Sequence, residues 1–303
     1  MHARHADRPR SRHTLPLGSR QLEGYGHEVV VANARKVRMI YDSDHKNDRL
    51  DARMLARLGR VDVNLLAPIR HRRAETQADL AVVRSREALV AARVKLVNVV
   101  RGMVKAIGGR LPKSTTAAFG GKMASLIPPE LKHAMGPLLK SIRALTEQID
   151  RYDEQIGRLA DKKYPETKLL QQVKGIGPLI SLTYVLTLDD PYRFAKSRTV
   201  GNYLGLSPRQ RESGGSSPQL GITKAGNGHL RWLLVQAAQY ILGPLAPDSQ
   251  LRRWGLDLAA RGGKNAKKRA VVAVARKLAV LLHRLWVTAE VYEPLHKIDS
   301  QAA

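Results

Sequence analysis

The sequence predicts a mainly α-helical fold. Residues 74–107 and 138–159 repeat apolar side chains at the three- and four-residue spacing of one helix face. Two more apolar helices are expected, one from about Leu230 and one over Val271–Leu285. A single β-branched run, His27–Ala32, predicts a buried strand. Helices should therefore build most of the core, with any sheet confined to the N-terminal part of the chain.

Composition points to a polyanionic partner. The 303-residue chain carries 52 Lys and Arg against 26 Asp and Glu, a formal net charge of +26. Such an excess repels itself unless a polyanion is bound, so nucleic acid is expected before an acidic small molecule. A membrane is not expected, because no apolar run approaches the roughly 20 residues of a spanning helix and the basic N-terminus lacks a secretory signal. The absence of cysteine excludes disulfides and thiolate metal sites and fits a cytoplasmic location.

The N-terminal region divides into two parts. Residues 1–21 hold several arginines and two prolines without helix or strand periodicity, which predicts a disordered basic arm. Residues 22–72 contain the predicted strand and then a helix that begins near Asn47. Ordered structure is therefore expected only after the arm.

Two carboxylates mark the start of that helix. Asp48 and Asp51 are three residues apart, so both side chains project from one face of its first turn. Carboxylate pairs of this kind hold Mg²⁺, which prefers oxygen ligands together with a substrate phosphate. Aspartate near a helix N-terminus is also explained by capping and by the helix macrodipole. The residues alone leave both interpretations open.

Residues 73–165 predict a coiled-coil helical arm. Its first helix ends at Gly108-Gly109 and carries one apolar seam, formed by Leu89, Leu96, Val100, Met103 and Ile107. Its second helix ends at Tyr164-Pro165 and carries a heptad seam, formed by Leu138, Ile142, Leu145, Ile149, Tyr152, Ile156 and Leu159. These helices could pair as an internal antiparallel hairpin or join a partner chain. The length of the heptad pattern favours dimerisation, and we expect a homo-oligomer, either a dimer or a tetramer.

A polar, glycine-bearing loop lies within residues 166–303. It runs from Arg209 to Ser217 and is too rich in Gly and Ser for a helix. Ser213 in this loop is the candidate nucleophile, because the surrounding cations would attract a phosphate and stabilise a developing alkoxide. Those cations are Arg209, Arg211, Lys224 and Arg231. A solvated turn with a spare serine fits the same residues.

A second basic cluster precedes the last apolar helix. Residues 261–284 hold eight Lys and Arg and no acid. The cluster predicts an entry for nucleic-acid phosphates and consists of Lys264, Lys267, Lys268 and Arg269. A solvated basic face is the alternative for any one of these side chains.

Three segments carry a resemblance to a known family. GLSPRQRESGG, GITKAGNGHLR and LLVQAA, in this order, resemble the C-terminal domain of the DEDD-type, serine-using insertion-sequence transposases. That family includes the bridge-RNA-guided recombinases. The resemblance implies that Ser213, in the step Glu212-Ser213-Gly214, attacks DNA. It also implies that Asp48 and Asp51 supply the last two acids of the DEDD set, on an RNase H-like (RuvC-like) domain.

The same resemblance implies two further acids, which would come before residue 27. The position of the expected Glu falls in the basic arm, where the nearby acid is Asp7, next to Pro9 and unsuited to a central strand. Glu23 and Glu28 are the other acids in reach, and neither has a suitable setting. We therefore expect an N-terminally incomplete copy of the family with a truncated α/β RNase H-like domain.

The implied function is a DNA transposase or recombinase. It would cut and rejoin DNA through Ser213, with Mg²⁺ on the acids and a guide RNA selecting the sequence. Two alternatives stay open: a nucleic-acid-binding remnant without chemistry, and a structure-specific nuclease that uses the acids without the serine. Whether this copy is an active enzyme is left open, as are the target sequence, the guide RNA and the oligomer size.

Overall fold

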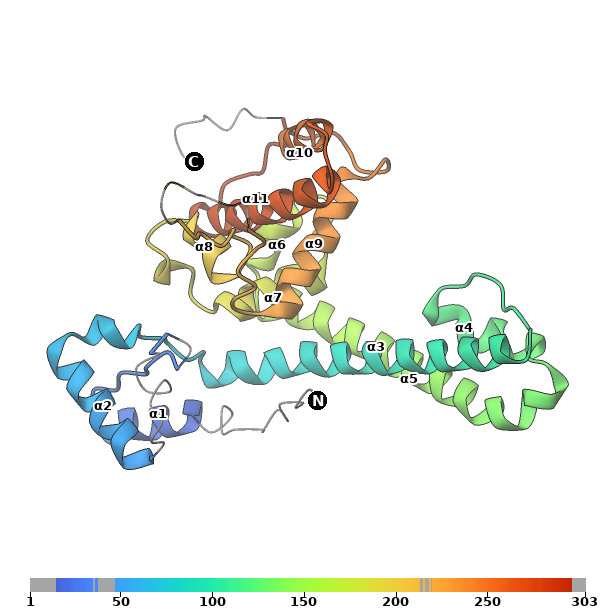
Figure 1. The fold of residues 1–303 in the computed structure, drawn as a ribbon, viewed down its shortest axis with the longest axis horizontal. Coiled ribbons are helices and arrows are strands. Elements are labelled where there is room, and N and C mark those ends of the chain that lie inside the picture. The colour runs from blue at the N-terminus through green and yellow to red at the C-terminus, as the bar shows by residue number, and fades with distance from the viewer. Residues whose placement is uncertain are drawn as a thin grey trace. The chain divides into compact units, whose positions relative to one another are not determined.

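The computed structural model describes residues 15–34, 36–37, 47–212, 215, 218 and 220–295. These residues are mainly helical, as the sequence predicts, and they divide into two compact units (Figure 1). The first unit comprises Met1–Ala74 and the second Glu75–Ala303. In the described part of the chain, no helix is both long enough and apolar enough to cross a membrane.

The first unit contains two α-helices, α1 (Leu15–Gly24) and α2 (Asp48–Val61), and the 3₁₀ turn η2 (Val63–Leu66). Helix α1 corrects the prediction of a disordered arm for residues 15–21; residues 1–14 lie outside the described residues. A tertiary contact that composition cannot show holds α1, because the Arg20 guanidinium donates to the Arg72 carbonyl at 2.7 Å.

The predicted strand His27–Ala32 is wrong as a buried strand. Its pairing is an isolated antiparallel bridge between Val31 and Ile69, and most of its side chains are exposed or half-buried. The bridge continues in one more backbone bond, from Asn33 N to Leu66 O at 2.9 Å. A β-branched run needs extended neighbours to become a sheet, and among the described residues there is no β-sheet around it.

The second unit begins with two long helices, α3 (Ala74–Ala106) and α5 (Lys132–Lys162). They run antiparallel, because Arg86 on α3 pairs with Asp153 on α5, and Arg93, seven residues later on α3, pairs with Thr146, seven residues earlier on α5 (Figure 1). The connection between them contains α4 (Thr116–Lys122), η3 (Ala124–Leu126) and η4 (Pro129–Leu131). The heptad seam of α5 thus packs within the chain.

The buried face of α3 differs from the predicted seam. Val100 of the predicted seam is buried, but Met103 and Ile107 are 46% and 53% exposed, and Val97 and Val104 are buried near the α4 end of the pair instead. Apolar side chains occur on several faces of α3, so spacing alone allows more than one seam. On α5, the buried members of the predicted heptad are Ile142, Ile149 and Ile156.

The C-terminal part of the second unit packs helices around α7. Its elements are α6 (Thr167–Gln171), α7 (Pro178–Leu188), η5 (Pro191–Arg193), α8 (Thr199–Tyr203), α9 (Gly228–Leu242), α10 (Gln250–Ala260) and α11 (Ala266–Thr288). Residues 181–188 of α7 are all buried, and the Tyr184 hydroxyl donates to the Ala279 carbonyl of α11 at 2.6 Å. Helices α10 and α11 approach closely at Gly255, where a Cβ would lie 2.4 Å from Val274 Cγ2.

Candidate functional site

The two candidate metal ligands lie on the first turn of α2. The Asn47 side chain caps this helix by accepting from Arg49 N at 2.9 Å, which places Asp48 and Asp51 in the turn just behind it. Asp48 is exposed and Asp51 is half-buried, and α2 has no buried residue. Among the described residues there is no group of three His, Cys, Asp or Glu side chains that could hold a metal ion. Two carboxylates on one face are the hard oxygen donors that a hydrated Mg²⁺ accepts, so the donor chemistry of the pair fits.

The candidate nucleophile Ser213 lies outside the described residues, as do Gly214, Ser216 and Ser217. The two segments that support its loop are described. Arg209 N donates to Gly221 O at 3.0 Å and Thr223 N donates to Ser207 O at 3.0 Å, on either side of a bridge between Pro208 and Ile222. A short antiparallel ladder therefore closes the base of the serine loop.

Two glycines fix the backbone below this ladder. Gly205 has φ +68°, and a Cβ there would lie 2.2 Å from the Ala225 nitrogen. Gly226 also has φ +68°, and its Cβ would lie 2.2 Å from the Tyr203 carbonyl oxygen. Only glycine allows both the left-handed conformation and this approach of backbone to backbone. Sequence reasoning treated these residues as parts of a motif and missed their structural role.

Arg231 holds the same region from α9. Its guanidinium donates to the Leu204 carbonyl at 2.9 Å and to the Ala225 carbonyl at 2.6 Å. Burial lowers the pKa of this guanidinium from its ordinary value, and it remains charged. The structure therefore brings Arg231, a predicted phosphate-binding residue, to the two chain segments that enter and leave the ladder. This role was not predicted from the sequence.

The remaining cations of the serine loop face solvent. Arg209, Arg211 and Lys224 are exposed around its base. Lys224 has a left-handed backbone with φ +55°, three residues before the Asn227 cap of α9. The Asn227 side chain accepts from Leu230 N at 3.1 Å and donates to the Thr187 hydroxyl of α7 at 3.3 Å. The exposed Lys224 thus lies on a backbone segment that Asn227 ties to the buried helix α7 by a hydrogen bond.

The second basic cluster lies at the start of α11. All four of its residues are exposed, namely Lys264, Lys267, Lys268 and Arg269. The first turn of α11 contains no acid, and its N-cap residue Asn265 makes no side-chain capping bond. A helix N-terminus carries partial positive charge, so these cations add to an electrostatic field that already favours an anion.

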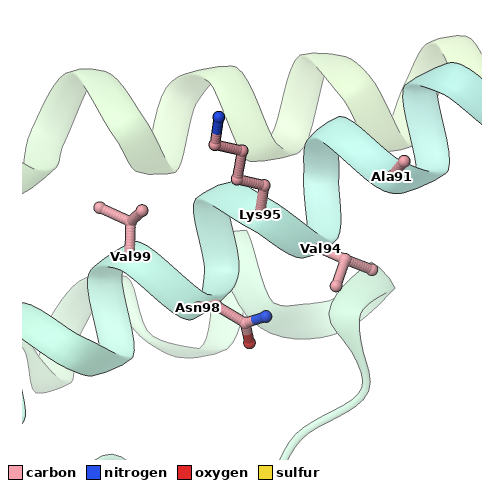
Figure 2. A pocket seen from close by; sticks show the side chains of 5 residues that line it. All are labelled: Ala91, Val94, Lys95, Asn98 and Val99. Carbon is pink, nitrogen blue, oxygen red and sulfur yellow. The ribbon is translucent and has the colours of Figure 1, made fainter. Parts of the chain in front are cut away.

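A shallow depression on α3 is separate from these residues. Figure 2 shows its lining, which comes from one helix only: Ala91, Val94, Lys95, Asn98 and Val99. None of the predicted site residues lines it. Among the described residues of the candidate site, Arg209, Arg211 and Lys224 form an exposed, positively charged surface around the base of the loop.

The helical scaffold presents exposed cations around the base of this loop, and such a basic surface favours a nucleic-acid partner. Comparison with protein families narrows this class of nucleic-acid-binding protein to transposases. Residues 167–249 match the model described as the transposase IS116/IS110/IS902 family, and residues 7–108 match the transposase model DEDD_Tnp_IS110.

Curated relatives agree with these two matches. The probable family 20 transposase of Pseudomonas aeruginosa is 30% identical over 284 residues, which cover 91% of this chain and 82% of that protein. The transposase for insertion sequence element IS1328 of Yersinia enterocolitica is 30% identical over 269 residues, covering 86% of this chain and 77% of the relative. The transposase for element IS1111A of Coxiella burnetii is 28% identical, with 83% and 70% covered. The chain belongs to the IS116/IS110/IS902 family of transposases.

Proposed function

We propose that this chain is a DNA transposase that cuts and rejoins DNA through Ser213. The observation that carries the proposal is the construction of the loop base, where a backbone ladder, two close glycines and Arg231 hold the chain on either side of the serine. Membership of the family supplies the reaction class and DNA as the substrate. The exposed cations around the loop supply the attraction for the phosphate.

The chemical step balances without an external oxidant or reductant. The Ser213 oxygen forms a bond to a backbone phosphorus while one P–O bond of the DNA breaks. The serine proton leaves, and the departing DNA oxygen takes up a proton. Rejoining is the reverse, with the hydroxyl of another strand attacking the phosphoserine. Arg209, Arg211 and Lys224 would offset the charge that develops on the phosphate oxygens.

Asp48 and Asp51 would hold Mg²⁺ as the divalent metal of this proposal. When bound, such an ion polarises a phosphate and lowers the pKa of its water or hydroxyl ligands. The two residues provide carboxylate oxygens on one helical face, and the Asn47 cap fixes the turn that carries them. The assignment of residues 22–72 to a partial RNase H-like domain belongs to the same proposal.

The protein surface would hold nucleic-acid backbones, while a guide RNA would select the sequence. Exposed Lys and Arg contact phosphates without reading bases, so they can bind the backbone while the RNA selects the sequence. The nucleic-acid-binding residues are Arg209, Arg211, Lys224, Arg231, Lys264, Lys267, Lys268 and Arg269. Residues 73–165 remain our predicted coiled-coil arm and residues 166–303 our predicted transposase domain, in a homo-oligomeric assembly.

Trapping a covalent protein–DNA species tests the proposal. The 303-residue chain is incubated with DNA of its own element, RNA and Mg²⁺, and the adduct is resolved on a denaturing gel. Ser213→Ala should abolish the adduct and leave DNA affinity nearly unchanged, whereas Ser216→Ala and Ser217→Ala should retain it. An adduct that survives Ser213→Ala contradicts the assignment of the nucleophile.

The same experiment separates the alternatives. Nucleic-acid binding by the unaltered chain without any adduct favours a binding protein that lacks chemistry. Metal-dependent cutting by the Ser213→Ala variant favours a nuclease that uses the acids alone.

A further inference from the structure

The solvent face of α9 presents aromatic side chains in a protein that exposes few of them. Trp232 is 54% exposed, although tryptophan normally buries most of its surface. Two turns further along the helix, Tyr240 is 44% exposed. Gln236 lies between them and is exposed as well. These three residues follow the four-residue spacing of one helix face, and we call them the α9 stripe.

The Trp232 indole is supported from one side. The His229 imidazole stacks on it, with ring centroids 6.0 Å apart and ring planes 22° from parallel. His229 is held in turn by Glu87 of α3, whose carboxylate lies 2.9 Å from Nδ1. Burial lowers the pKa of His229, and Glu87 opposes that change. Glu87, on a helix of the arm, thus fixes the ring on which the exposed tryptophan rests.

The Tyr240 ring has its own support. Gly175, in the turn between α6 and α7, has φ +95°, and a Cβ at this position would lie 2.7 Å from Tyr240 Cδ1. The ring therefore rests against backbone that only glycine makes available. Along the helix axis, eight residues separate the two rings by about 12 Å.

The composition of this part of the chain favours nucleic acid as the ligand. Between Pro191 and Gln250 the chain holds seven Lys and Arg against two acids, which favours an anionic partner. Beyond Trp232 on this helix face, the exposed side chains Gln236 and Gln239 are both amides. Amide side chains hydrogen-bond to base edges, and exposed aromatic rings stack on base faces.

We propose that the α9 stripe is a stacking platform for unpaired nucleotide bases, with Trp232 and Tyr240 each receiving a base. The inference rests on the proposed function for the presence of nucleic acid and adds the class of ligand, a single strand or an unpaired segment. A duplex offers base faces only at its ends, so the platform selects unpaired DNA or RNA. Glu87 repels phosphate, which leaves the strand backbone on the cationic surface and the bases on the rings.

Affinity measurements with matched probes test the platform. The probes are a single-stranded DNA oligonucleotide, an RNA of the same sequence and the corresponding DNA duplex. Trp232→Ala should weaken binding of the single strands about tenfold and leave duplex binding within about twofold. Trp232→Phe should retain most of the affinity because it keeps a ring. The tighter of the DNA and RNA probes identifies the natural strand.

The control variant is Tyr192→Ala, which removes another exposed aromatic ring, 75% exposed, from the same unit. It should bind all three probes like the unaltered chain. In a Trp254→Phe/Trp286→Phe background, Trp232 is the remaining tryptophan, and its fluorescence should be quenched by the single strands more than by the duplex. Circular dichroism of every variant checks the fold.

Three results would overturn the platform. One is an equal loss of single-strand and duplex affinity in Trp232→Ala, and another is no loss at all. The third is a smaller oligomer with unchanged affinity, which would make the stripe a protein interface. Failure of the proposed function is recognised separately, because it removes the Ser213 adduct and leaves the difference between the single-strand and duplex probes intact.

Discussion

The serine loop and the acidic helix α2 are supported in opposite ways. The base of the loop is fixed by backbone hydrogen bonds, by Gly205 and Gly226 at backbone contact, and by Arg231 across two carbonyls. Helix α2 has no buried residue, and one side-chain cap defines its start. The comparison teaches that two segments proposed to act in the same reaction can differ in how strongly the fold holds them. Substitutions at the loop base should change the stability of the fold, whereas substitutions on α2 should change function with only a small effect on stability.

The largest effect is expected at Gly205. Gly205→Ala places a Cβ 2.2 Å from the Ala225 nitrogen at φ +68°, which combines left-handed strain with overpacking. The free energy of unfolding should fall by about 2–5 kcal/mol. Urea titration measures the change.

Gly221→Ala is the matched control, because Gly221 lies in the same ladder without a positive φ and with nothing within 4 Å of its Cβ position. Its unfolding free energy should stay within about 0.5 kcal/mol of the unaltered chain. Equal stability of the two variants would contradict the close approach at Gly205.

Arg231→Ala should have the next largest effect. The Leu204 and Ala225 carbonyls both lose their guanidinium donor, and Leu204 is fully buried. The expected loss of unfolding free energy is about 1–3 kcal/mol. Arg211→Ala, which removes an exposed arginine of the same loop, should change stability by about 0.5 kcal/mol or less. If both variants were equally stable, Arg231 would act on the ligand and not on the loop base.

A smaller effect on stability should come from the protonation of His283 as the pH falls. This side chain is buried on α11, with Nε2 2.9 Å from the Pro191 carbonyl and Nδ1 2.9 Å from the Ser197 hydroxyl. Burial lowers its pKa below the ordinary 6.5, so the unfolded chain binds the proton more readily. The contribution to stability is therefore complete above pH 6.5 and decreases as the pH falls through the lowered value.

Melting temperatures from about pH 8 to about pH 5 measure this effect. His283→Gln keeps neutral hydrogen-bonding groups and should show a shallower decline on acidification than the unaltered chain. Parallel curves for the two proteins would assign the acid sensitivity to other groups.

The smallest effect on stability is expected on α2. Asp48→Asn and Asp51→Asn remove the favourable charge at the helix N-terminus, which costs about 0.3–1 kcal/mol. Adduct formation should nevertheless be lost, because the metal loses its carboxylate ligands. Asp62→Asn, at the other end of α2, controls for loss of one negative charge and should retain the adduct. A full yield of adduct from Asp48→Asn would remove this residue from the metal site.

Local patterns in the sequence were sufficient for the five longest of the helices that the structure describes. The predicted helix of residues 74–107 is α3 (Ala74–Ala106), and the predicted start near Asn47 is the cap of α2. These assignments succeed because spacing and capping act within a few residues. Ser213 and the metal-binding role of Asp48 and Asp51 remain predictions.

Long-range contacts decided the features that local patterns missed. The β-branched run at His27–Ala32 needed a partner strand, and Val31 pairs only through its bridge to Ile69. Spacing allowed several seams on α3, and packing against α5 buried Val97 and Val104 in place of Met103. Helix α1 forms where composition predicted an arm, with Arg20 bonded to a carbonyl far along the chain.

By itself, the sequence determined the helical class, the excess of positive charge and the family motif around Ser213. The tertiary structure alone decided which groups hold the loop base and which side chains face solvent. The sequence shows Arg231 only as one more cation. Its hydrogen bonds to the Leu204 and Ala225 carbonyls depend on the tertiary structure, which brings α9 next to both segments. Trp232 belongs to the apolar helix predicted from about Leu230, and its exposure depends on which face of α9 packs against the core. Periodicity is a property of neighbouring residues, whereas burial and pairing depend on segments that the chain brings together from a distance.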